Sequence, residues 1–483
     1  MSAPLFGSQP LGVLSPDQED QVHDQAMRIL EDIGVDVLHE RARALFSDAG
    51  QKLEDDRVRL DRAFVMEQVE KAPTTFTLHA RNATNTVEVG AGTPLWMNVG
   101  GPPFYSDLDD GRREGFLGGH DTLVKLTQAA EPLNCVQIGA VEAVELPVHW
   151  RHMEMEYSAI RWSDLPYTTY GTSGPRARDG IEMARILHGG ELADRTVMLG
   201  IVNSISPLIW DFRMVDALIA WAESNQAVVV TPFLLAGATA PVSVAGGLAQ
   251  QAAEALSGVA LAQLVRPGSP CLYGSFFTAT DMRTGAPAFG TPESVFGVLA
   301  GGQMARRYGL PFRGGGGLAS SNAVDAQAAA ETQMMLWATM LAGTDVVLHA
   351  AGWLEGGLTA SAEKFALDVE LLRQFQRQQA GIGFTQEELA YDAIAEMGPG
   401  GLFLASPHTR AHFKEWLYLS PLFQTQDFAT WDMMGREDTA QVANVLWKQL
   451  LGSYEDPGLD AAIDEELRTY IEKRKLDPPE PED

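Results

Sequence analysis

Apolar residues recur at helical spacing near the start of the chain. From Val22 to Ile33 they stand three or four positions apart, which is typical of an amphipathic helix. Ser15 and Gln18 precede this run at the spacing of a capping box, and Gly34 supplies a stop signal. We therefore expect a helix between Ser15 and Gly34, as the first element of an N-terminal layer of helices and short strands over residues 1–90.

From Leu95 onward the pattern changes to short apolar segments that alternate with longer stretches of helical periodicity. This alternation is typical of repeated βα units and a parallel sheet. The helical stretches include residues 153–162, 180–187, 249–265, 293–309 and 326–343, and a last helix is expected over residues 362–381. The eight segments that we predict as strands are LWMNV from Leu95, CVQIG from Cys135, YTTY from Tyr167, VMLGIVN from Val197, AVVVTPF from Ala227, CLYGSF from Cys271, PFRGG from Pro311 and DVVLHA from Asp345.

The length of this alternating region favours a closed barrel. Leu95 to His349 spans close to the roughly 250 residues that a (β/α)8 barrel uses. We therefore predict an α/β fold, a (β/α)8 TIM barrel over residues 91–385. A C-terminal helical extension with a disordered acidic tail, DPPEPED, is expected over residues 386–483. The alternative is an open doubly wound sheet, because strand boundaries assigned from one sequence drift by a few residues.

Composition excludes several classes of partner. The net charge of -29 over 483 residues repels nucleic acids and anionic membrane surfaces. The two cysteines, Cys135 and Cys271, lie in apolar segments without CxxC spacing, which indicates buried free thiols in a reducing compartment. The start of the chain carries no signal-peptide pattern, and no apolar window reaches about 18 residues. We expect a soluble cytoplasmic protein.

The carboxyl ends of the predicted strands are where a barrel carries its active site. The side chains there are polar but nearly free of carboxylates, and no Ser/His/Asp set, carboxylate pair or lysine is found among them. No residue is therefore assigned as an acid, base or nucleophile. We expect a site that positions its substrate for a reactive group supplied from elsewhere. The candidate substrate-binding residues are Arg313, His349, Asn98, Asn203, Glu254, Tyr273, Phe276 and Trp353.

Arg313 and His349 are candidates for holding a substrate carboxylate. A guanidinium can form a bidentate fork with a carboxylate, and an imidazole can donate a further hydrogen bond. The alternatives are an internal salt bridge from Arg313 to an acidic loop residue, and a core histidine bonded to a backbone carbonyl. Both readings stay open at this stage.

The aromatic candidates point to a cation. Tyr273, Phe276 and Trp353 fall on or just beyond predicted strands, where their rings could surround a quaternary ammonium, although aromatic residues at such positions also belong to cores. Glu254, on the helix after the fifth strand, could add a countercharge. His408 and His412 stand four residues apart, but no third ligand completes a metal-binding pattern, so no metal site is expected.

Several long blocks of the sequence carry a resemblance to a known family. They are NVGGPPFYSDLDDGRREG from Asn98, PVSVAGGLAQQAAEALSGVALAQLVRPGSPCLYGSF from Pro241, DMRTGAPAFGTPE from Asp281 with ARRYGLPFRGGG from Ala305, VLHAAGWLEGGLTASAEKFALD from Val347, and SPHTRAHF from Ser406. With these blocks, the chain resembles the trimethylamine methyltransferase family, in particular its branch without pyrrolysine, which includes glycine betaine methyltransferases.

The resemblance implies a barrel that passes a methyl group to the cob(I)amide of a separate corrinoid protein docked over its mouth. No corrinoid-binding DxHxxG motif occurs here, so the cofactor is expected on another chain and none is bound permanently. Pyrrolysine, which the trimethylamine enzymes carry in the stretch matching VDAQAAAE, is replaced here by ordinary residues around Gln327 and Ala328. This departure argues against trimethylamine.

The same departure favours a quaternary amine such as glycine betaine. A quaternary ammonium already carries a positive charge and leaves as a neutral tertiary amine, so it needs no general acid. The alternatives are a sulfonium substrate, since a cation surround does not distinguish nitrogen from sulfur, and a betaine-binding protein without methyl transfer. Self-association into a homo-oligomer is expected only by analogy with other large barrels.

Overall fold

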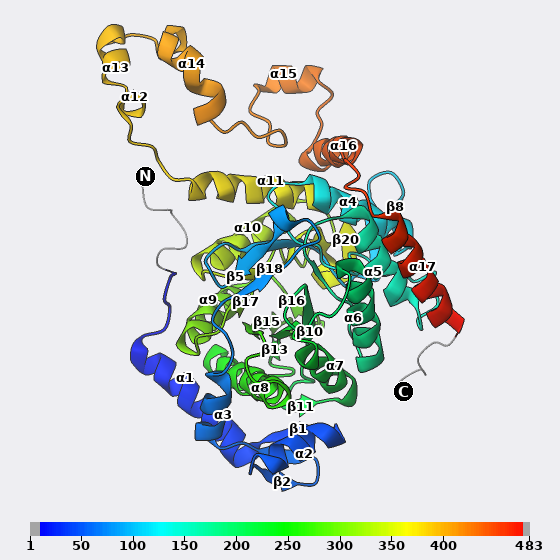
Figure 1. The fold of residues 1–483 in the computed structure, drawn as a ribbon. Coiled ribbons are helices and arrows are strands. Elements are labelled where there is room, and N and C mark those ends of the chain that lie inside the picture. Colours follow the sequence, from blue (N-terminus) through cyan, green and yellow to red (C-terminus); the bar gives the residue numbers. More distant parts are fainter. Residues whose placement is uncertain (1–9, 477–483) are drawn as a thin grey trace.

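The centre of the molecule is a closed ring of eight parallel strands (Figure 1). The structure, a computed structural model, describes residues 10–476. Seven strands pair in the order β6-β18-β17-β14-β12-β10-β9, and the second strand, around Cys135, closes the ring because Met97 bridges Cys135 and Val136 bridges Tyr167. The predicted barrel is therefore confirmed and the open sheet was the wrong alternative. The strands are β6 (Leu95–Asn98), β9 (Tyr167–Thr168), β10 (Met198–Val202), β12 (Ala227–Val230), β14 (Cys271–Gly274), β17 (Phe312–Arg313) and β18 (Val346–Ala351).

Each barrel strand is followed by a helix that packs on the outside of the ring (Figure 1). Each of the six predicted helical stretches coincides with one of these helices, and three of them run two residues past its end. The helices alternate with the strands as a right-handed βα repeat requires. The helices, in chain order, are α4 (Leu117–Ala129), α5 (Arg151–Trp162), α6 (Gly174–His188), α7 (Phe212–Glu223), α8 (Val244–Val265), α9 (Pro292–Arg307), α10 (Ala326–Leu341) and α11 (Ala362–Gln379).

Side chains alternate across each barrel strand, and this alternation separates the barrel interior from the helical layer. The interior is an apolar cluster to which Leu95, Leu199, Val229 and Leu272 belong. Their sequence neighbours point outward and join the larger core beneath the helices. Both cysteines are buried and free, as predicted. Polar side chains therefore face the barrel axis only beyond this apolar interior cluster, at the strand ends.

The helices of the N-terminal layer lie against α8 (Figure 1). Its first helix, α1 (Pro16–Arg28), begins with the predicted capping box: the Ser15 hydroxyl accepts from the Gln18 backbone N–H, and the Gln18 side chain accepts from Ser15 N–H. A short π-helical turn extends it to Gly34, whose φ of 81° ends the element. The other elements of the layer are β1 (Val35–Val37), α2 (Glu40–Asp48), β2 (Lys52–Glu54), β3 (Arg57–Arg59), α3 (Arg62–Val69), β4 (Phe76–Leu78) and β5 (Val87–Val89).

The C-terminal segment leaves the barrel and returns to it. After α11, an arm over residues 380–438 carries α12 (Gln386–Leu389), α13 (Tyr391–Met397), α14 (Pro407–Trp416) and α15 (Phe428–Met433) away from the barrel (Figure 1). The chain returns with α16 (Thr439–Gly452), which packs on α11 and α4, and α17 (Ala461–Leu476), which packs on α5 and α6. The predicted disordered tail, 477–483, lies outside the described residues. Within residues 10–476, no helix is long and apolar enough to span a membrane.

Candidate active site

A cavity of about 660 Å³ opens at the carboxyl ends of the barrel strands. All eight strands or the loops directly after them contribute to its wall, which is where barrel enzymes carry their active sites. Four of the eight predicted site residues line it together: Asn203, Phe276, Arg313 and His349. Its volume lies within the range of about 300–1,000 Å³ that small-molecule sites occupy.

Arg313, at the end of β17, is a buried cation without an anionic partner. Its side chain is 2% exposed, and its one hydrogen bond runs from Nη1 to the Ser275 carbonyl oxygen at 3.1 Å. Nε has no partner, and no carboxylate of the described residues lies within 4.0 Å of the guanidinium. The internal salt bridge considered from the sequence is therefore absent from the described part of the chain. Burial lowers the pKa of Arg313 to about 9, which leaves it charged at neutral pH.

His349 reaches the cavity because β18 departs from regular geometry. Val347 pairs with Trp96 and Ala351 with Asn98, so the strand bulges between these pairs, and His349 has a φ of 56°. Regular alternation would point this residue outward, since Leu348 lies in the barrel interior. A bulge redirects side chains in this way, and a left-handed backbone is costly for a residue other than glycine.

The protonation state of His349 follows from its hydrogen bond. The Gly100 backbone N–H donates to Nδ1 at 3.2 Å, so the neutral ring carries its proton on Nε2. Burial, followed by the nearby Arg313 charge, lowers the pKa of His349 well below its ordinary value. Gly100 fits here because a Cβ at this position would lie 2.4 Å from the Gln137 side chain. His349 is therefore a neutral donor beside a cationic one.

An aromatic cluster forms the wall next to these two groups. The Phe276 ring lies 4.8 Å from the Arg313 guanidinium carbon and 4.9 Å from the Phe233 ring centroid. Trp353 packs behind them, with ring centroids 4.5 Å from His349 and 6.2 Å from Phe276, and is not part of the cavity lining. Two further rings were not chosen as site residues from the sequence: Phe233, which lines the cavity and begins the short strand β13 (Phe233–Ala236), and Phe289, which follows the short strand β16 (Pro287–Ala288).

Three predicted site residues point away from the cavity. Asn98 is fully buried and uses its amide to join the first strand to the second: Oδ1 accepts from Gln137 N–H, and Nδ2 donates to the carbonyls of Gln137 and Val99. Tyr273 faces the helical layer, where its hydroxyl accepts from Gln251 at 3.4 Å and its ring lies against Tyr308. Neither residue lines the cavity.

Glu254 is the third, and it acts on the cavity wall from behind. Its carboxylate accepts from the hydroxyls of Ser204 and Ser206 and from the backbone N–H of Leu208, all in the loop that follows β10. The Gln250 side chain supplies a further donor at 2.8 Å. This fully satisfied, buried carboxylate holds the loop and is not exposed to a ligand. Asn203, on the same loop, does line the cavity, and its Nδ2 donates to the Thr231 carbonyl oxygen at 2.6 Å.

A carboxylate that the strand ends do not contain reaches the cavity from a loop. Glu142 follows the second strand by several residues and lines the wall together with Tyr170. The Tyr170 hydroxyl donates to Glu142 Oε1 at 2.7 Å, and Arg151 lies 3.8 Å from Oε2. Burial raises the pKa of Glu142 above its ordinary value. The search from the sequence missed it because it considered only residues at the strand ends.

Within residues 10–476, no cluster of three or more His, Cys, Asp or Glu side chains is arranged to hold a metal ion. His408 and His412 share a face of α14, but His412 stacks on Trp416 at 3.8 Å and contacts Glu387 at 3.0 Å. Both lie on the arm. The fold and the cavity therefore define a class: a (β/α)8 barrel whose carboxyl-end cavity holds a free guanidinium, a neutral histidine and aromatic rings.

Comparison with known proteins identifies the family within this class. Residues 4–479 match the family model described as Trimethylamine methyltransferase (MTTB), and the chain belongs to this family. It is 39% identical to the glycine betaine methyltransferase of Desulfitobacterium hafniense (strain Y51), over 96% of this chain and 97% of the relative. It is 30% identical to the proline betaine:corrinoid methyltransferase of Eubacterium limosum, over 84% of this chain and 85% of the relative.

Solved structures support the fold. The monomethylamine methyltransferase of Methanosarcina barkeri aligns with a TM-score of 0.52 at 10% identity, covering 93% of this chain and 90% of that one. At this identity the likeness concerns the fold alone. Residues 326–331 form the start of α10, where Gln327 is exposed and its Nε2 donates to Glu331 Oε1.

Proposed function

We propose that this protein transfers a methyl group from a small betaine, such as glycine betaine, to the cob(I)amide of a separate corrinoid protein. The observation that carries the proposal is Arg313, a buried cation whose side chain has one hydrogen bond among the described residues, to a backbone carbonyl. A buried charge of this kind is costly unless a ligand pairs with it. A substrate carboxylate would accept hydrogen bonds from Arg313 and from His349 Nε2 and would remove that cost.

The other end of a betaine matches the remaining wall of the cavity. The rings of Phe233 and Phe276 offer aromatic faces to a quaternary ammonium, and each such contact stabilises a desolvated cation by about 0.5–2 kcal/mol. Glu142, which accepts a hydrogen bond from the Tyr170 hydroxyl, also lines the cavity, and its carboxylate would add negative potential there. A molecule with a carboxylate at one end and a quaternary ammonium at the other therefore suits the site.

The reaction needs little acid–base chemistry from the protein. The methyl carbon leaves the nitrogen without its bonding electrons and forms a bond to Co(I), which supplies two electrons and becomes Co(III). The electron pair of the broken C–N bond stays on nitrogen, so a neutral tertiary amine is released without a proton transfer. The work of the barrel is to orient the methyl group towards the mouth and to exclude water from the substrate.

The cobalt centre is a reactant on a partner, and it must reach the carboxyl-end mouth. In support of a corrinoid acceptor, the relative from Eubacterium limosum is named a corrinoid methyltransferase. Phe233 and Phe276 line the cavity at the carboxyl ends of the strands, so a large cofactor could approach a methyl group held against these rings from the mouth of the barrel. We place the docking surface of the corrinoid protein there.

The direct test is anaerobic spectrophotometry with chemically reduced cob(I)alamin and a panel of methyl donors. The panel contains glycine betaine, proline betaine, carnitine, trimethylamine and a sulfonium. Loss of the cob(I) absorption with a betaine is the expected result. Turnover of the sulfonium alone would show that the substrate is a sulfonium and not a betaine. Tight betaine binding without turnover would indicate a binding protein.

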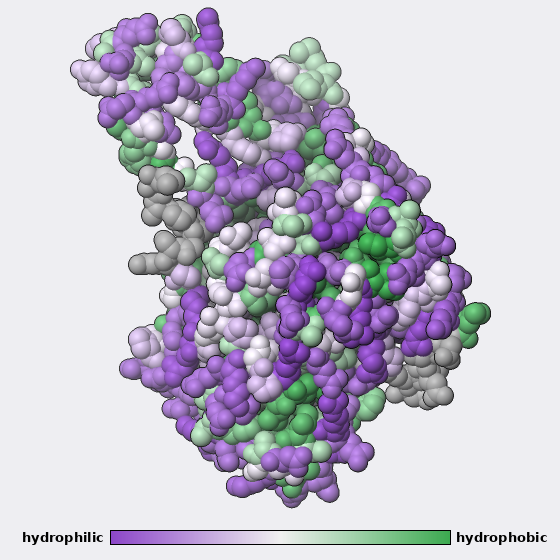
Figure 2. All heavy atoms as spheres, viewed as in Figure 1, coloured by the Kyte–Doolittle hydropathy of each residue, from purple (hydrophilic) through white to green (hydrophobic). Residues whose placement is uncertain are grey.

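We also propose that the chain self-associates through its arm. Several large apolar side chains along residues 380–438 are 66–83% exposed, and apolar and polar surface alternates along this segment in Figure 2. An interface with a corrinoid protein must open in every catalytic cycle, and transient interfaces are no more apolar than ordinary surface. The exposed apolar side chains of the arm therefore suit a permanent interface with a second copy of this chain better than a transient interface with a corrinoid protein. Examples of these side chains are Phe384, Tyr391, Leu402, Leu404, Leu419, Phe428 and Met433.

Sedimentation velocity tests the self-association. The wild type is expected to sediment as an oligomer, and Leu404→Glu with Phe428→Glu is expected to shift it to the monomer without loss of betaine binding. Substituting the exposed Met282 with Glu, outside the arm, is the matched control. A wild-type monomer would overturn the proposal. The reducing cytoplasm is the compartment that we propose, since Cys135 and Cys271 are both free thiols.

A further inference from the structure

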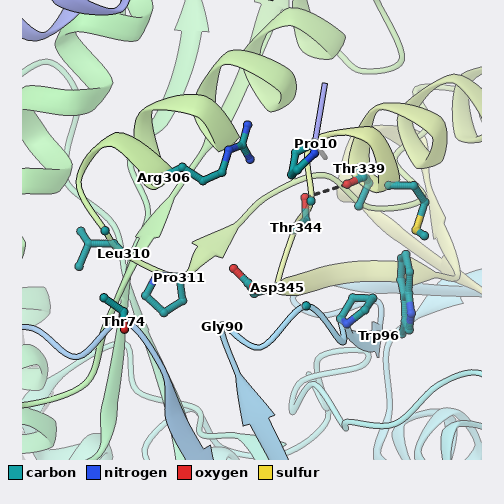
Figure 3. Close-up of a pocket in the computed structure, with 15 residues that line it drawn as sticks. Pro10, Thr74, Gly90, Trp96, Arg306, Leu310, Pro311, Thr339, Thr344 and Asp345 are labelled. Carbon is teal, nitrogen blue, oxygen red and sulfur yellow. Dashed lines mark hydrogen bonds between the residues drawn. The ribbon is translucent and has the colours of Figure 1, made fainter. Parts of the chain in front are cut away.

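A second cavity, of about 310 Å³, lies at the opposite, amino-terminal end of the barrel (Figure 3). Its wall includes the start of the first strand at Trp96, the end of α9 at Arg306, and the turn before β18 at Asp345. Active sites of barrel enzymes lie at the other end, so this cavity is not part of the methyl-transfer site. Its volume is at the lower end of the range for small-molecule sites.

The cavity holds two opposite charges that are not paired with each other. Arg306 Nη1 donates to the Ala342 carbonyl oxygen at 2.6 Å, and Asp345 Oδ2 accepts from the Phe312 backbone N–H at 2.8 Å. Neither side chain has an ion-pair partner within 4.0 Å among the described residues. Figure 3 shows the two side chains set apart among the residues that line the cavity, Arg306 on α9 and Asp345 in the turn before β18.

Arg306 is exposed and Asp345 is half-buried, so each charged group has lost part of its hydration. Burial lowers the pKa of Arg306 and raises the pKa of Asp345, in each case disfavouring the charged form. A direct ion pair would relieve both, but the backbone contacts of each side chain keep the two groups apart. A ligand with an anionic group and a cationic group could pair with both at once.

An aromatic face completes this complementarity. Trp96 is 8% exposed and lines the same cavity as Asp345. The indole ring is the best aromatic partner for a cation. A carboxylate would therefore be expected at Arg306, and an ammonium group between Asp345 and Trp96.

We propose that this amino-end cavity is a second binding site, for a small zwitterion that carries a carboxylate and an ammonium group, such as a free amino acid or a betaine. The site is separate from the methyl-transfer cavity, and its occupation does not require methyl transfer. Asp345 accepts a hydrogen bond from the backbone N–H of Phe312, the residue before Arg313, so β17 (Phe312–Arg313) connects a residue of each site.

Isothermal titration calorimetry of the full chain tests the proposal with binding as the only readout. The Arg313→Met variant is used as the background, because this substitution weakens ligand binding in the carboxyl-end cavity. Glycine betaine, glycine and L-proline are titrated, with choline and acetate as ligands that carry one charge each. We expect at least one zwitterion to bind, and choline and acetate to bind at least tenfold more weakly than that zwitterion.

Two further substitutions locate the binding. Asp345→Asn retains the acceptor for Phe312 N–H, so it is expected to fold, and Arg306→Met removes the other charge. Each substitution should weaken zwitterion binding at least tenfold. Hydrogen exchange in peptides around residues 306–312 and 340–346 should slow when the zwitterion binds to Arg313→Met, and should not slow when Asp345→Asn or Arg306→Met is added. Absence of binding, binding unchanged in both variants, or choline binding as tightly as a zwitterion would overturn the proposal.

Discussion

Two cations are almost completely buried in this barrel, and they are treated differently. Lys364, on α11, is 0% exposed and pairs with the equally buried Asp368, while its Nζ also donates to the Gly317 carbonyl oxygen at 3.2 Å. Arg313, at the end of β17, is 2% exposed and has no carboxylate. Both groups have lost their water, but only Lys364 has a counter-charge within the described chain.

This difference distinguishes a buried charge that stabilises the fold from a buried charge that binds a ligand. A paired buried charge contributes to the folded state, and removing its partner leaves an uncompensated charge. An unpaired one costs stability until a ligand arrives, which is the pattern expected of a site that binds an anion. Removal of each charge should therefore have opposite effects on stability, and four predictions follow from this contrast.

The largest effect is expected at the structural pair. Asp368→Asn leaves Lys364 buried without a counter-charge and should lower the free energy of unfolding by about 3–5 kcal/mol. Urea denaturation measures this change. The double variant Lys364→Met with Asp368→Leu removes both charges and should recover most of the loss. If Asp368→Asn has wild-type stability, the pair is not structural and the contrast fails.

Arg313→Met should do the reverse. Betaine affinity should fall by about 1.5–3 kcal/mol, the value of hydrogen bonds to charged groups, while stability without ligand is unchanged or higher. Calorimetry and urea denaturation on the same protein separate the two effects. Arg313→Lys, which keeps the charge but not the fork, should bind betaine with intermediate affinity. A stability loss like that of Asp368→Asn would make Arg313 a structural residue.

A buried anion sharpens the comparison, because it can avoid its charge by binding a proton. Burial raises the pKa of Glu156 from 4.5 to about 8, although hydrogen bonds from Thr169 and the Tyr170 backbone oppose the shift. The folded protein then binds a proton that the unfolded chain has released, so stability should fall as pH rises from about 4.5 to about 8.

Glu156→Gln removes this dependence. Above about pH 8 the variant should be more stable than the wild type by at least about 1.4 kcal/mol, which corresponds to one pKa unit. Below about pH 4.5 the two should converge. Thermal unfolding across this range measures the difference, and parallel pH profiles for both proteins would show that Glu156 stays ionised.

The smallest effect is expected at the aromatic wall. Phe276→Leu retains the apolar packing but removes a ring that faces the ammonium group, so betaine affinity should fall by about 1 kcal/mol. The uncharged isostere 3,3-dimethylbutanoate should lose no affinity, because it lacks the cation. Equal losses for both ligands would mean that Phe276 contributes shape alone.

Much of the fold could be predicted, because each barrel strand is a short apolar run and each following helix has clear periodicity. Side-chain alternation also explains much of the site. Residues an even number of positions from Leu199 or Leu272 on the same strand point towards the barrel axis, as these two do. This places Asn203 and Phe276 in the cavity. Tyr273 is out of phase and faces the helices.

The rest of the site depends on features that leave no local pattern in the sequence. His349 enters the cavity through a bulge, and Glu142 enters through a loop. Asn98 stands at a strand end, but its amide is used by the neighbouring strand, whose position only the closed barrel reveals. The role of Glu254 could not be predicted, because the sequence does not show that the loop after β10 lies against its helix.

The most direct test of the central claim measures cob(I)alamin methylation by the wild type and by Arg313→Met with two donors, glycine betaine and tetramethylammonium. Both are quaternary amines, but only glycine betaine carries a carboxylate. The account predicts that the substitution sharply lowers kcat/KM for glycine betaine and leaves that for tetramethylammonium unchanged or higher. Equal losses for the two donors, or no loss for glycine betaine, would contradict the assignment of Arg313 as the group that binds the substrate carboxylate.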